Sequence, residues 1–242
     1  MNAVTWLGHS STVVELDGTR FVTDPVLGRR VAHLWRSAAV PRAELGRLDV
    51  VLVSHVHLDH LDLSSLVQIG RAVPMVVPLR AGSILRRRGI EHVLEVVAGN
   101  ELEFGPVRVH VTHAEHGVVR RYVRARTAAV GYVLRGSRSV YFAGDTDVFD
   151  GMGELGPVDV ALLPVGGWGP RVPPGHLDAE RAAQALRLIR PMTAVPVHWG
   201  TFRTPFASAP DEQVAHAFVQ AAAAAAPQVD VRVLRIRETM CL

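Results

Sequence analysis

The sequence lacks lysine, contains one cysteine and has no long hydrophobic run, and each of these absences excludes a class of protein or site. The cysteine, Cys241, lies one residue from the C-terminus, which excludes an internal disulfide framework and a thiolate zinc site. Any bound metal must therefore be held by nitrogen and oxygen. No apolar run reaches the ~18 residues that a membrane span needs, and the opening letters MNAVTWLGHSS turn polar too early for a secretory signal. We expect a cytoplasmic protein without a transmembrane segment.

Because lysine is absent, all 26 basic residues are arginines, and against 23 acidic residues they leave a formal net charge of only +3. The overall charge therefore says little about nucleic acid. Local arginine clusters at residues 86–88 and 120–126 carry forked donors that suit a phosphate. A solvated helix face is the simpler interpretation of the first cluster. For the second, phosphate binding and a plain loop are equally favoured.

The chain has 242 residues, of which 48% are hydrophobic and 20% charged, enough for the core of one large α/β domain. No low-complexity linker divides it, so we expect a single domain over residues 1–242. Strands are predicted over residues 11–16, 20–24, 50–54, 74–78, 92–97, 107–113, 128–136, 139–145, 158–165, 193–198 and 229–236. Helices are predicted over residues 62–70, with Asp62 as N-cap, and over residues 79–89, 177–190 and 211–226. Meanders mixed with crossover helices predict sheets sandwiched between helix layers.

The segment SHVHLDH, residues 54–60, follows the apolar strand and is unusually rich in metal-binding side chains. His55 and His57 are two residues apart, so in an extended backbone they leave on the same face and can share one ion. A turn at Asp59 directs Asp59 and His60 toward a second ion, at the roughly 3.5–4 Å separation of two-metal hydrolytic sites. A histidine-rich surface loop is the alternative, but the H-x-H-x-D-H spacing argues against it.

A two-metal site needs further ligands, and these are expected at the ends of other strands. Asp145 follows a strand and a glycine in YFAGDTD, and its two oxygens can each face one cation. We interpret it as the bridge between the ions. The alternative role, a helix N-cap or turn residue, suits Asp147 better. His198 ends another strand, in TAVPVHWGT.

The segment VHVTHAEHG offers three histidines for the remaining position. His110 is interpreted as a residue of the sheet face. His116, just before Gly117 at the start of a loop, is the better ligand, and His113 is the reserve.

These segments occur in one order along the chain, together with WLGHSS, TDP and LPVGGW, and this order resembles the metallo-β-lactamase superfamily. Within it, the chain is similar to the ascorbate-6-phosphate lactonase-like and N-acyl-phosphatidylethanolamine phospholipase D-like group. The resemblance covers essentially the whole chain and implies a four-layer αββα sandwich, with the metals in a cleft at one edge of the two sheets. It implies one ion held by His55, His57 and His116, a second held by Asp59, His60 and His198, and Asp145 as the bridge.

The same resemblance implies roles for three further residues. His176, in PGHLDAERAAQ, is a candidate for substrate contact or proton donation, with equal weight on a plain loop residue near an N-cap. His9, in WLGHSS, is expected to support the site rather than to bind metal. Asp24, in TDP, is expected to orient a metal-binding histidine by accepting its second N–H.

Departures from related branches narrow the expected chemistry. The flavin-diiron branch has glutamate where this chain has His57, so zinc hydrolysis is favoured over iron redox chemistry. The segment HAEHG does not reproduce the GHTxG context of glyoxalase-like and antibiotic-hydrolysing members. The extra domain of RNA-processing members is not evident in the sequence.

Two divalent cations flanking one water lower its pKa from ~15.7 toward ~7, which supplies a metal-bridging hydroxide at neutral pH. Asp59 could receive the proton, and His176 could protonate the leaving group. We therefore predict a binuclear hydrolase, with zinc favoured and manganese or iron able to replace it, that acts on a phosphodiester or lactone in a small-molecule or lipid-like substrate.

Two other functions stay open from the sequence. One is a metal-binding or ligand-binding protein of the same fold with little turnover. The other is a nucleic-acid phosphodiesterase that uses the arginine clusters as a phosphate track, although nucleic acid is the less favoured partner. Homo-oligomer formation is also left open.

Overall fold

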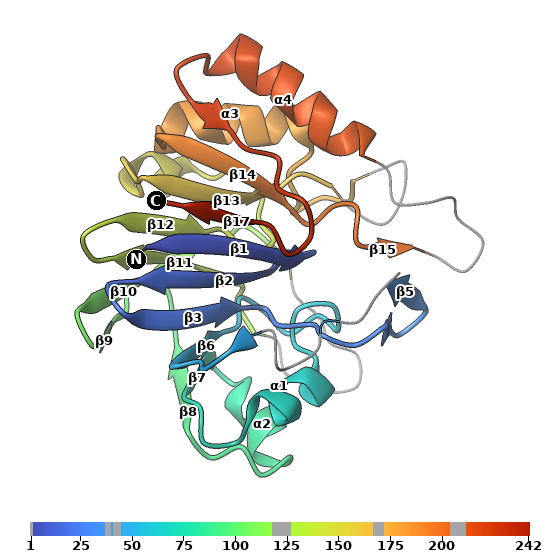
Figure 1. Ribbon diagram of the computed structural model, residues 1–242, viewed down its shortest axis with the longest axis vertical. Coiled ribbons are helices and arrows are strands. Elements are labelled where there is room, and N and C mark those ends of the chain that lie inside the picture. Colours follow the sequence, from blue (N-terminus) through green and yellow to red (C-terminus); the bar gives the residue numbers. More distant parts are fainter. Residues whose placement is uncertain (1, 37–39, 41–44, 118–126, 167–171, 204–211) are drawn as a thin grey trace.

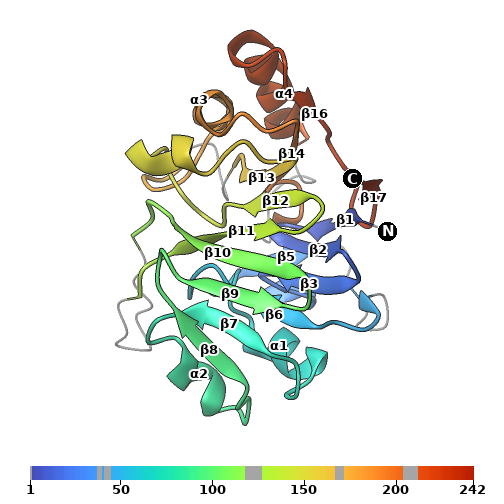
Figure 2. The same ribbon diagram turned by 90° about the vertical axis from the view of Figure 1, so that its left-hand side faces the viewer.

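The computed structural model describes residues 2–36, 40, 45–117, 127–166, 172–203 and 212–242, and two seven-stranded β-sheets form its centre (Figure 1). A small third sheet joins β4 (Arg30–Val31), β5 (Leu34–Arg36) and β15 (Phe202–Arg203). The two large sheets face one another (Figure 2). They therefore form the inner two layers of the sandwich that the sequence predicts.

The first sheet has the order β17-β1-β2-β3-β6-β7-β8. Its strands are β1 (Ala3–Gly8), β2 (Ser11–Leu16), β3 (Thr19–Thr23), β6 (Val50–Leu52), β7 (Met75–Pro78), β8 (Val93–Val96) and β17 (Thr239–Cys241). The predicted hairpin is confirmed, because β2 and β3 pair antiparallel across Asp17 and Gly18, which both have positive φ. Strands β3 and β6 pair in parallel, with Thr23 opposite Leu52. The segments that follow these two strands therefore leave from the same edge of the sheet.

The second sheet has the order β16-β14-β13-β12-β11-β10-β9. Its strands are β9 (Glu101–Phe104), β10 (Val107–His113), β11 (Val130–Arg135), β12 (Ser139–Phe142), β13 (Val160–Pro164), β14 (Thr193–Val197) and β16 (Asp230–Val231). Strands β12, β13 and β14 are parallel neighbours. Their carboxyl ends meet at one edge, which brings together the segments that begin near residues 143, 165 and 198.

Helices cover the outer faces of both sheets (Figure 1). They are α1 (Leu63–Ile69), α2 (Gly82–Arg86), α3 (Ala179–Ile189) and α4 (Gln213–Ala225), with a 3₁₀ turn at Asp150–Glu154. Leu66 and Leu85 pack into a cluster on the α1 and α2 side, and Leu186 and Phe218 into one on the α3 and α4 side. A third cluster, which includes Phe142, fills the space between the sheets. The predicted αββα fold is confirmed.

The predicted helix start at Asp62 is confirmed, since its carboxylate accepts hydrogen bonds from the main-chain N–H groups of Ser64 and Ser65. Helix α2 is shorter than predicted, because Arg80 has a φ of 75° and Gly89 a φ of 73°, both outside the helical region. No helix in the described ranges has the length and apolar character that crossing a bilayer requires.

The two edge strands of the second sheet, β16 and β9, differ from the prediction. The predicted strand over residues 229–236 contains only β16 at its start, because the chain then crosses from the second sheet to β17 in the first. Strand β9, with the sequence ELEF, was not predicted. It is an edge strand whose side chains are exposed or half-buried, so the sequence carries no run of apolar residues there.

Candidate metal centre

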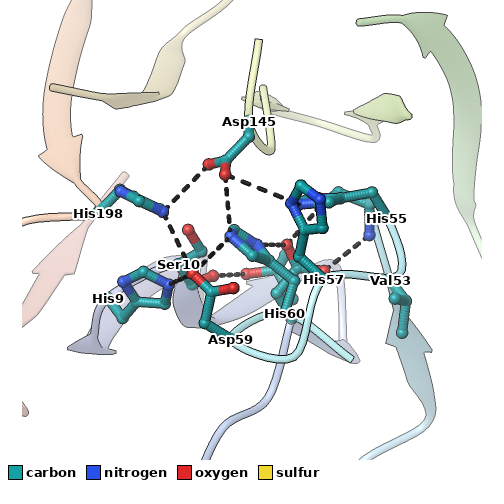
Figure 3. A network of polar contacts seen from close by, with 12 residues as sticks. His9, Ser10, Val53, His55, His57, Asp59, His60, Asp145 and His198 are labelled. Carbon is teal, nitrogen blue, oxygen red and sulfur yellow. Dashed lines mark hydrogen bonds and ion pairs between the residues drawn. The ribbon is translucent and has the colours of Figure 1, made fainter. Parts of the chain in front are cut away.

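The predicted ligands converge where the carboxyl ends of strands from both sheets meet. The loop after β6 carries the SHVHLDH segment, and Asp145 and His198 come from the loops after β12 and β14. Figure 3 shows the Asp145 carboxylate pointing toward His55, His60 and His198. Parallel pairing within each sheet and face-to-face packing of the two sheets bring these distant segments together.

Four side chains form what we call the first ligand group. They are His55, His57, His116 and Asp145, and one ligand atom from each lies within 4.8 Å of all the others. The His55 Nε2 to His57 Nδ1 distance is 3.0 Å, and the His57 Nδ1 to His116 Nε2 distance is 3.2 Å. Ligand atoms at tetrahedral Zn–N distances are about 3.3 Å apart. The spacing therefore fits one ion.

Four further side chains form the second ligand group. They are His9, Asp59, His60 and His198, and their ligand atoms also lie within 4.8 Å of one another. From Asp59 Oδ2, the distances are 3.2 Å to His9 Nε2, 3.5 Å to His60 Nε2 and 3.8 Å to His198 Nε2. This group also has the spacing of a coordination shell.

Asp145 lies between the two groups. Its Oδ2 is 3.7 Å from His55 Nε2 and 3.1 Å from His60 Nε2, and its Oδ1 is 3.3 Å from His198 Nε2. The residue is only 2% exposed, so these imidazoles rather than water surround its carboxylate. One carboxylate thus contacts imidazoles of both groups.

Main-chain carbonyls set the orientation of two imidazoles. His116 Nδ1 donates to the Gly175 carbonyl at 2.7 Å, and His198 Nδ1 donates to the Gly166 carbonyl at 2.9 Å. In the neutral form of both rings Nε2 then carries no proton and points toward the ligand cluster. Such outer hydrogen bonds fix the tautomer of metal-binding histidines.

Asp24 orients a third imidazole. Its Oδ2 accepts a 2.7 Å hydrogen bond from His60 Nδ1, and it accepts two hydrogen bonds from Ser54, from the main-chain N–H at 2.7 Å and from Oγ at 2.5 Å. The hydrogen bond expected for Asp24 is therefore present. Burial raises the pKa of Asp24, and the bonds from His60 and Ser54 oppose this effect.

The pKa values within the first ligand group favour neutral imidazoles. Burial lowers the pKa of His55 well below its usual value, lowers that of His57, and lowers that of His116 to about 4. A neutral imidazole is the form that binds a metal ion. These three side chains are therefore ready to bind at neutral pH.

Within the second ligand group the environment favours positive charge on His60 and His198, whereas burial and the neighbouring His198 lower the pKa of His9 to about 3. Burial alone lowers the pKa of His60 and His198, but the neighbouring carboxylates, Asp145 first and then Asp59, more than offset this effect. They raise the pKa of His198 to about 9 and that of His60 well above its usual value. Burial raises the pKa values of Asp59 and Asp145, yet the neighbouring histidines hold both well below their usual range. Two carboxylates are thus ionised at a buried point where a cation is stabilised.

Buried polar atoms that make no hydrogen bond also indicate that a cation is stabilised here. Within the described ranges, His60 Nε2 and Asp145 Oδ1 are buried and make no hydrogen bond. His60 Nε2 lies 3.1 Å from Asp145 Oδ2, but not in hydrogen-bond geometry. Buried polar atoms without a hydrogen bond are costly. A metal ion bound by these atoms would remove that cost, so the residues present fit a metal.

His176 and His9 both lie at the centre. His176 Nε2 is 3.3 Å from Asp145 Oδ2, its ring is 4.6 Å from that of His116, and its side chain is 15% exposed. It therefore lies on the solvent-accessible side. His9 is 1% exposed and lies closer to Asp59 than His60 does, at 3.2 Å against 3.5 Å. Sequence reasoning placed His9 near the site but gave no sign that it belongs to a ligand group.

Three residues near the ligands have positive φ without being glycine. They are His9 at 55°, Asp24 at 33° and His198 at 64°. Positive φ is uncommon for residues with a side chain, and such conformations concentrate at functional sites. Only the structure reveals this feature.

Several candidate residues lie outside the cluster. His113 is exposed, and its Nε2 is 3.3 Å from Glu115 Oε2, while His110 Nδ1 is 2.6 Å from Glu101 Oε1. The structure thus brings His116 into the first ligand group and leaves His113 outside it. Asp147 forms an ion pair with Arg181.

Among the described residues, the arginines of the first cluster, residues 86–88, are exposed. Arg86, in the first cluster, is paired with Glu95 at 2.8 Å on the surface. This pairing agrees with a solvated helix face. The second cluster, residues 120–126, lies outside the described residues, as does Trp168, the last residue of the LPVGGW segment.

Comparisons with known proteins show which family the chain resembles. Residues 19–199 match the family described as the β-lactamase superfamily domain. The chain is 34% identical over 216 residues to a metal-dependent hydrolase of Methanopyrus kandleri, covering 86% of this chain and 88% of that protein. It is 32% identical over 226 residues to N-acyl-phosphatidylethanolamine-hydrolyzing phospholipase D 1 of Caenorhabditis elegans, covering 82% of this chain.

The chain spans 64% of the length of that nematode protein and 59% of the length of mycobacterial relatives that are 32% identical to it. Among solved structures, a metallo hydrolase of Ignicoccus hospitalis superposes with a TM-score of 0.76 at 24% identity, covering 100% of this chain and 98% of that one. At this identity the similarity shows the fold. With the family match over most of its length, this chain belongs to the β-lactamase superfamily.

Proposed function

We propose that this chain is a binuclear metal-dependent hydrolase, working within the single domain expected over residues 1–242. The proposed ligands are His55, His57 and His116 for one ion, Asp59, His60 and His198 for the other, and Asp145 as the bridge. The observation that carries the proposal is the contact of Asp145 with imidazoles of both ligand groups, at 3.1 to 3.7 Å. The name of the M. kandleri relative, a metal-dependent hydrolase, supports the reaction class.

Zinc is the metal that this set of ligands favours. Every proposed ligand atom is an imidazole nitrogen or a carboxylate oxygen, and the spacing suits tetrahedral Zn–N distances. Manganese or iron can occupy similar nitrogen and oxygen shells. The metal is therefore proposed as zinc, with these two as alternatives to be tested by metal replacement.

When bound, a pair of divalent cations would acidify a water molecule and polarise the oxygen of the scissile group. The chain itself would supply the proton transfers. Asp59 has a 15% exposed side chain and an ionised carboxylate, so it can accept a proton from the attacking water. His9 lies 3.2 Å from the same carboxylate and would hold it in place.

His176 is proposed to protonate the leaving group. Its Nε2 faces the ligand cluster near Asp145, and the side chain reaches solvent. An imidazole at this position can approach a substrate that sits over both ligand groups. Proton transfer by a positioned side chain is worth roughly 10²–10⁴ in rate.

The proposed substrate is a phosphodiester or a lactone in a small-molecule or lipid-like compound. The similarity to a phospholipase D supports the phosphodiester, since that enzyme's name specifies cleavage of a phospholipid. Both substrates pass through a transition state whose added negative charge a dication pair stabilises.

The test is elemental analysis of the purified protein, followed by a hydrolysis screen with zinc, manganese or iron(II) restored. Phosphodiesters, lactones and thioesters form the panel. We expect two ions per chain and turnover of one class. Replacing His57 and Asp145 together by alanine should abolish metal loading, whereas His113→Ala, outside the cluster, should not. Two ions retained in the double variant would refute the assignment, and metal loading without any turnover would favour a binding protein of the same fold.

A further inference from the structure

Asp24 and Ser54 form a fully buried pair that lies behind both ligand groups. Asp24 follows β3 and Ser54 follows β6, the two parallel neighbours of the first sheet. Both residues are 0% exposed. Neither is a proposed ligand of the pair of ions, yet the Asp24–Ser54 pair contacts three parts of the metal centre.

The first contact reaches the second ligand group. His60 Nδ1 donates to Asp24 Oδ2 at 2.7 Å. The His60 ring is therefore held with Nε2 toward Asp59 and Asp145. Displacement of Asp24 would turn this ring.

The second contact reaches the first ligand group and follows from counting protons. The Ser54 hydroxyl has one proton, which it donates to Asp24 Oδ2 at 2.5 Å. His55 Nδ1 lies 3.0 Å from the same hydroxyl oxygen, which can now only accept. His55 must therefore carry its proton on Nδ1, which leaves Nε2 bare toward His57 and Asp145.

The third contact reaches the segment that carries the bridge. Gly144, directly before Asp145, has a φ of 62°, and a Cβ placed on it would lie 2.5 Å from the Cβ of Ser54. The backbone before Asp145 therefore packs directly on Ser54. The Ser54 carbonyl also accepts a 2.9 Å hydrogen bond from the N–H of Val130, which ties the pair to the second sheet.

One continuous buried unit thus connects His55, His60 and the backbone of Asp145, and the His55 and His60 rings are only 4.0 Å apart between centroids. We propose that Asp24 and Ser54 are positioning residues that couple the two metal positions. An ion bound by His55 would hold this ring, and through its Nδ1–H the Ser54 hydroxyl and Asp24, in one position, which orients His60 for the other ion. This inference rests on the proposed binuclear site.

The coupling can be measured as the factor by which one bound ion changes the affinity for the other. Couplings between sites in proteins typically amount to roughly 5- to 150-fold. Repulsion between two cations and the shared Asp145 also contribute to the total. The contribution of the Asp24–Ser54 pair is therefore read from the difference between variants rather than from the wild type alone.

Ser54→Ala removes the hydrogen bond to His55 and leaves the Asp24–His60 bond available. Ser11→Ala is the matched control, because the Ser11 hydroxyl is also buried and donates to the main-chain carbonyl of Asp24 at 2.7 Å. Zinc titrations followed by native mass spectrometry count the chains that hold no ion, one ion and two ions. We expect the coupling factor to fall at least about 5-fold in Ser54→Ala and to stay at the wild-type value in Ser11→Ala.

An unchanged coupling factor in Ser54→Ala overturns the proposal, as does an equal fall in Ser11→Ala. If Ser54→Ala does not fold, Ser54→Cys takes its place, since a thiol is a weaker hydrogen-bonding group of similar shape. A wild-type chain that never holds more than one ion overturns the binuclear site itself. If the wild type and all variants bind two ions with the same coupling factor, only the role of the Asp24–Ser54 pair is overturned.

Discussion

The two ligand groups differ in how deeply they are buried and in the charge around them. In the first, His57 and His116 are half-buried, and burial keeps the imidazoles neutral. In the second, His60 and His198 are almost fully buried, and the carboxylates around them favour positive charge. One position thus resembles an accessible site and the other an enclosed one. We expect the enclosed position to release its ion more slowly.

The largest expected effect comes from removing the residue that the two groups share. Asp145→Ala deletes a contact to each group, so both ions should be lost or bound more than about 100-fold more weakly, beyond the usual cost of losing an outer partner. Metal content after gel filtration measures this. His113→Ala, with an exposed histidine outside the cluster, should keep two ions. Two ions retained in Asp145→Ala would show that the groups do not share a bridge.

Single substitutions in each group should separate the two positions. We expect His57→Ala to retain the enclosed ion. We expect His60→Ala to retain the accessible ion while losing about 1–3 kcal/mol of folding free energy, because Asp24 would lose a buried hydrogen-bond donor. Metal analysis of both variants checks which ion each retains. Urea denaturation of the metal-free proteins checks the loss of folding free energy. Equal loss of both ions in both variants would contradict two distinct positions.

Substitution of His9 should change metal affinity at the enclosed position alone. Its Nε2 lies 3.2 Å from Asp59 Oδ2, so His9→Ala should weaken binding at the second group by roughly 10- to 100-fold, the cost of losing an outer partner. His9→Gln retains an N–H donor and should recover part of this affinity if His9 acts only by supporting Asp59. No recovery would indicate that His9 binds the ion itself. Competition with a zinc chelator measures both affinities.

The smallest effect on metal content is expected for His176. It lies beside Asp145 on the exposed side, so His176→Ala should keep both ions while kcat falls by roughly 10²–10⁴. A substrate with a leaving group that needs no protonation should show a much smaller fall. An equal fall for both substrates would argue against proton donation.

Much of this site follows from the sequence because it is built at strand ends. The apolar strand before SHVHLDH, the glycine before Asp145 and the strand before His198 each mark a place where a chain leaves a sheet. The αββα fold was predicted from the resemblance, and the structure confirms it. Local patterns of hydrophobic residues are enough to place such strands.

Other features depend on contacts between distant residues and could not be predicted. His9 enters the second ligand group because the first and second sheets meet, with the His198 N–H donating to the His9 carbonyl at 3.1 Å. The tautomer of His55 depends on Ser54 and Asp24, which lie 30 residues apart in sequence. Strand β9 carries no hydrophobic run because it is a half-exposed edge.

The central claim is tested most directly by anomalous diffraction at the zinc edge from crystals of the zinc-loaded protein. We predict two peaks roughly 3.5–4 Å apart, both in contact with Asp145, one beside His55, His57 and His116 and the other beside Asp59, His60 and His198. A single peak, or two peaks that do not share Asp145, would contradict the account.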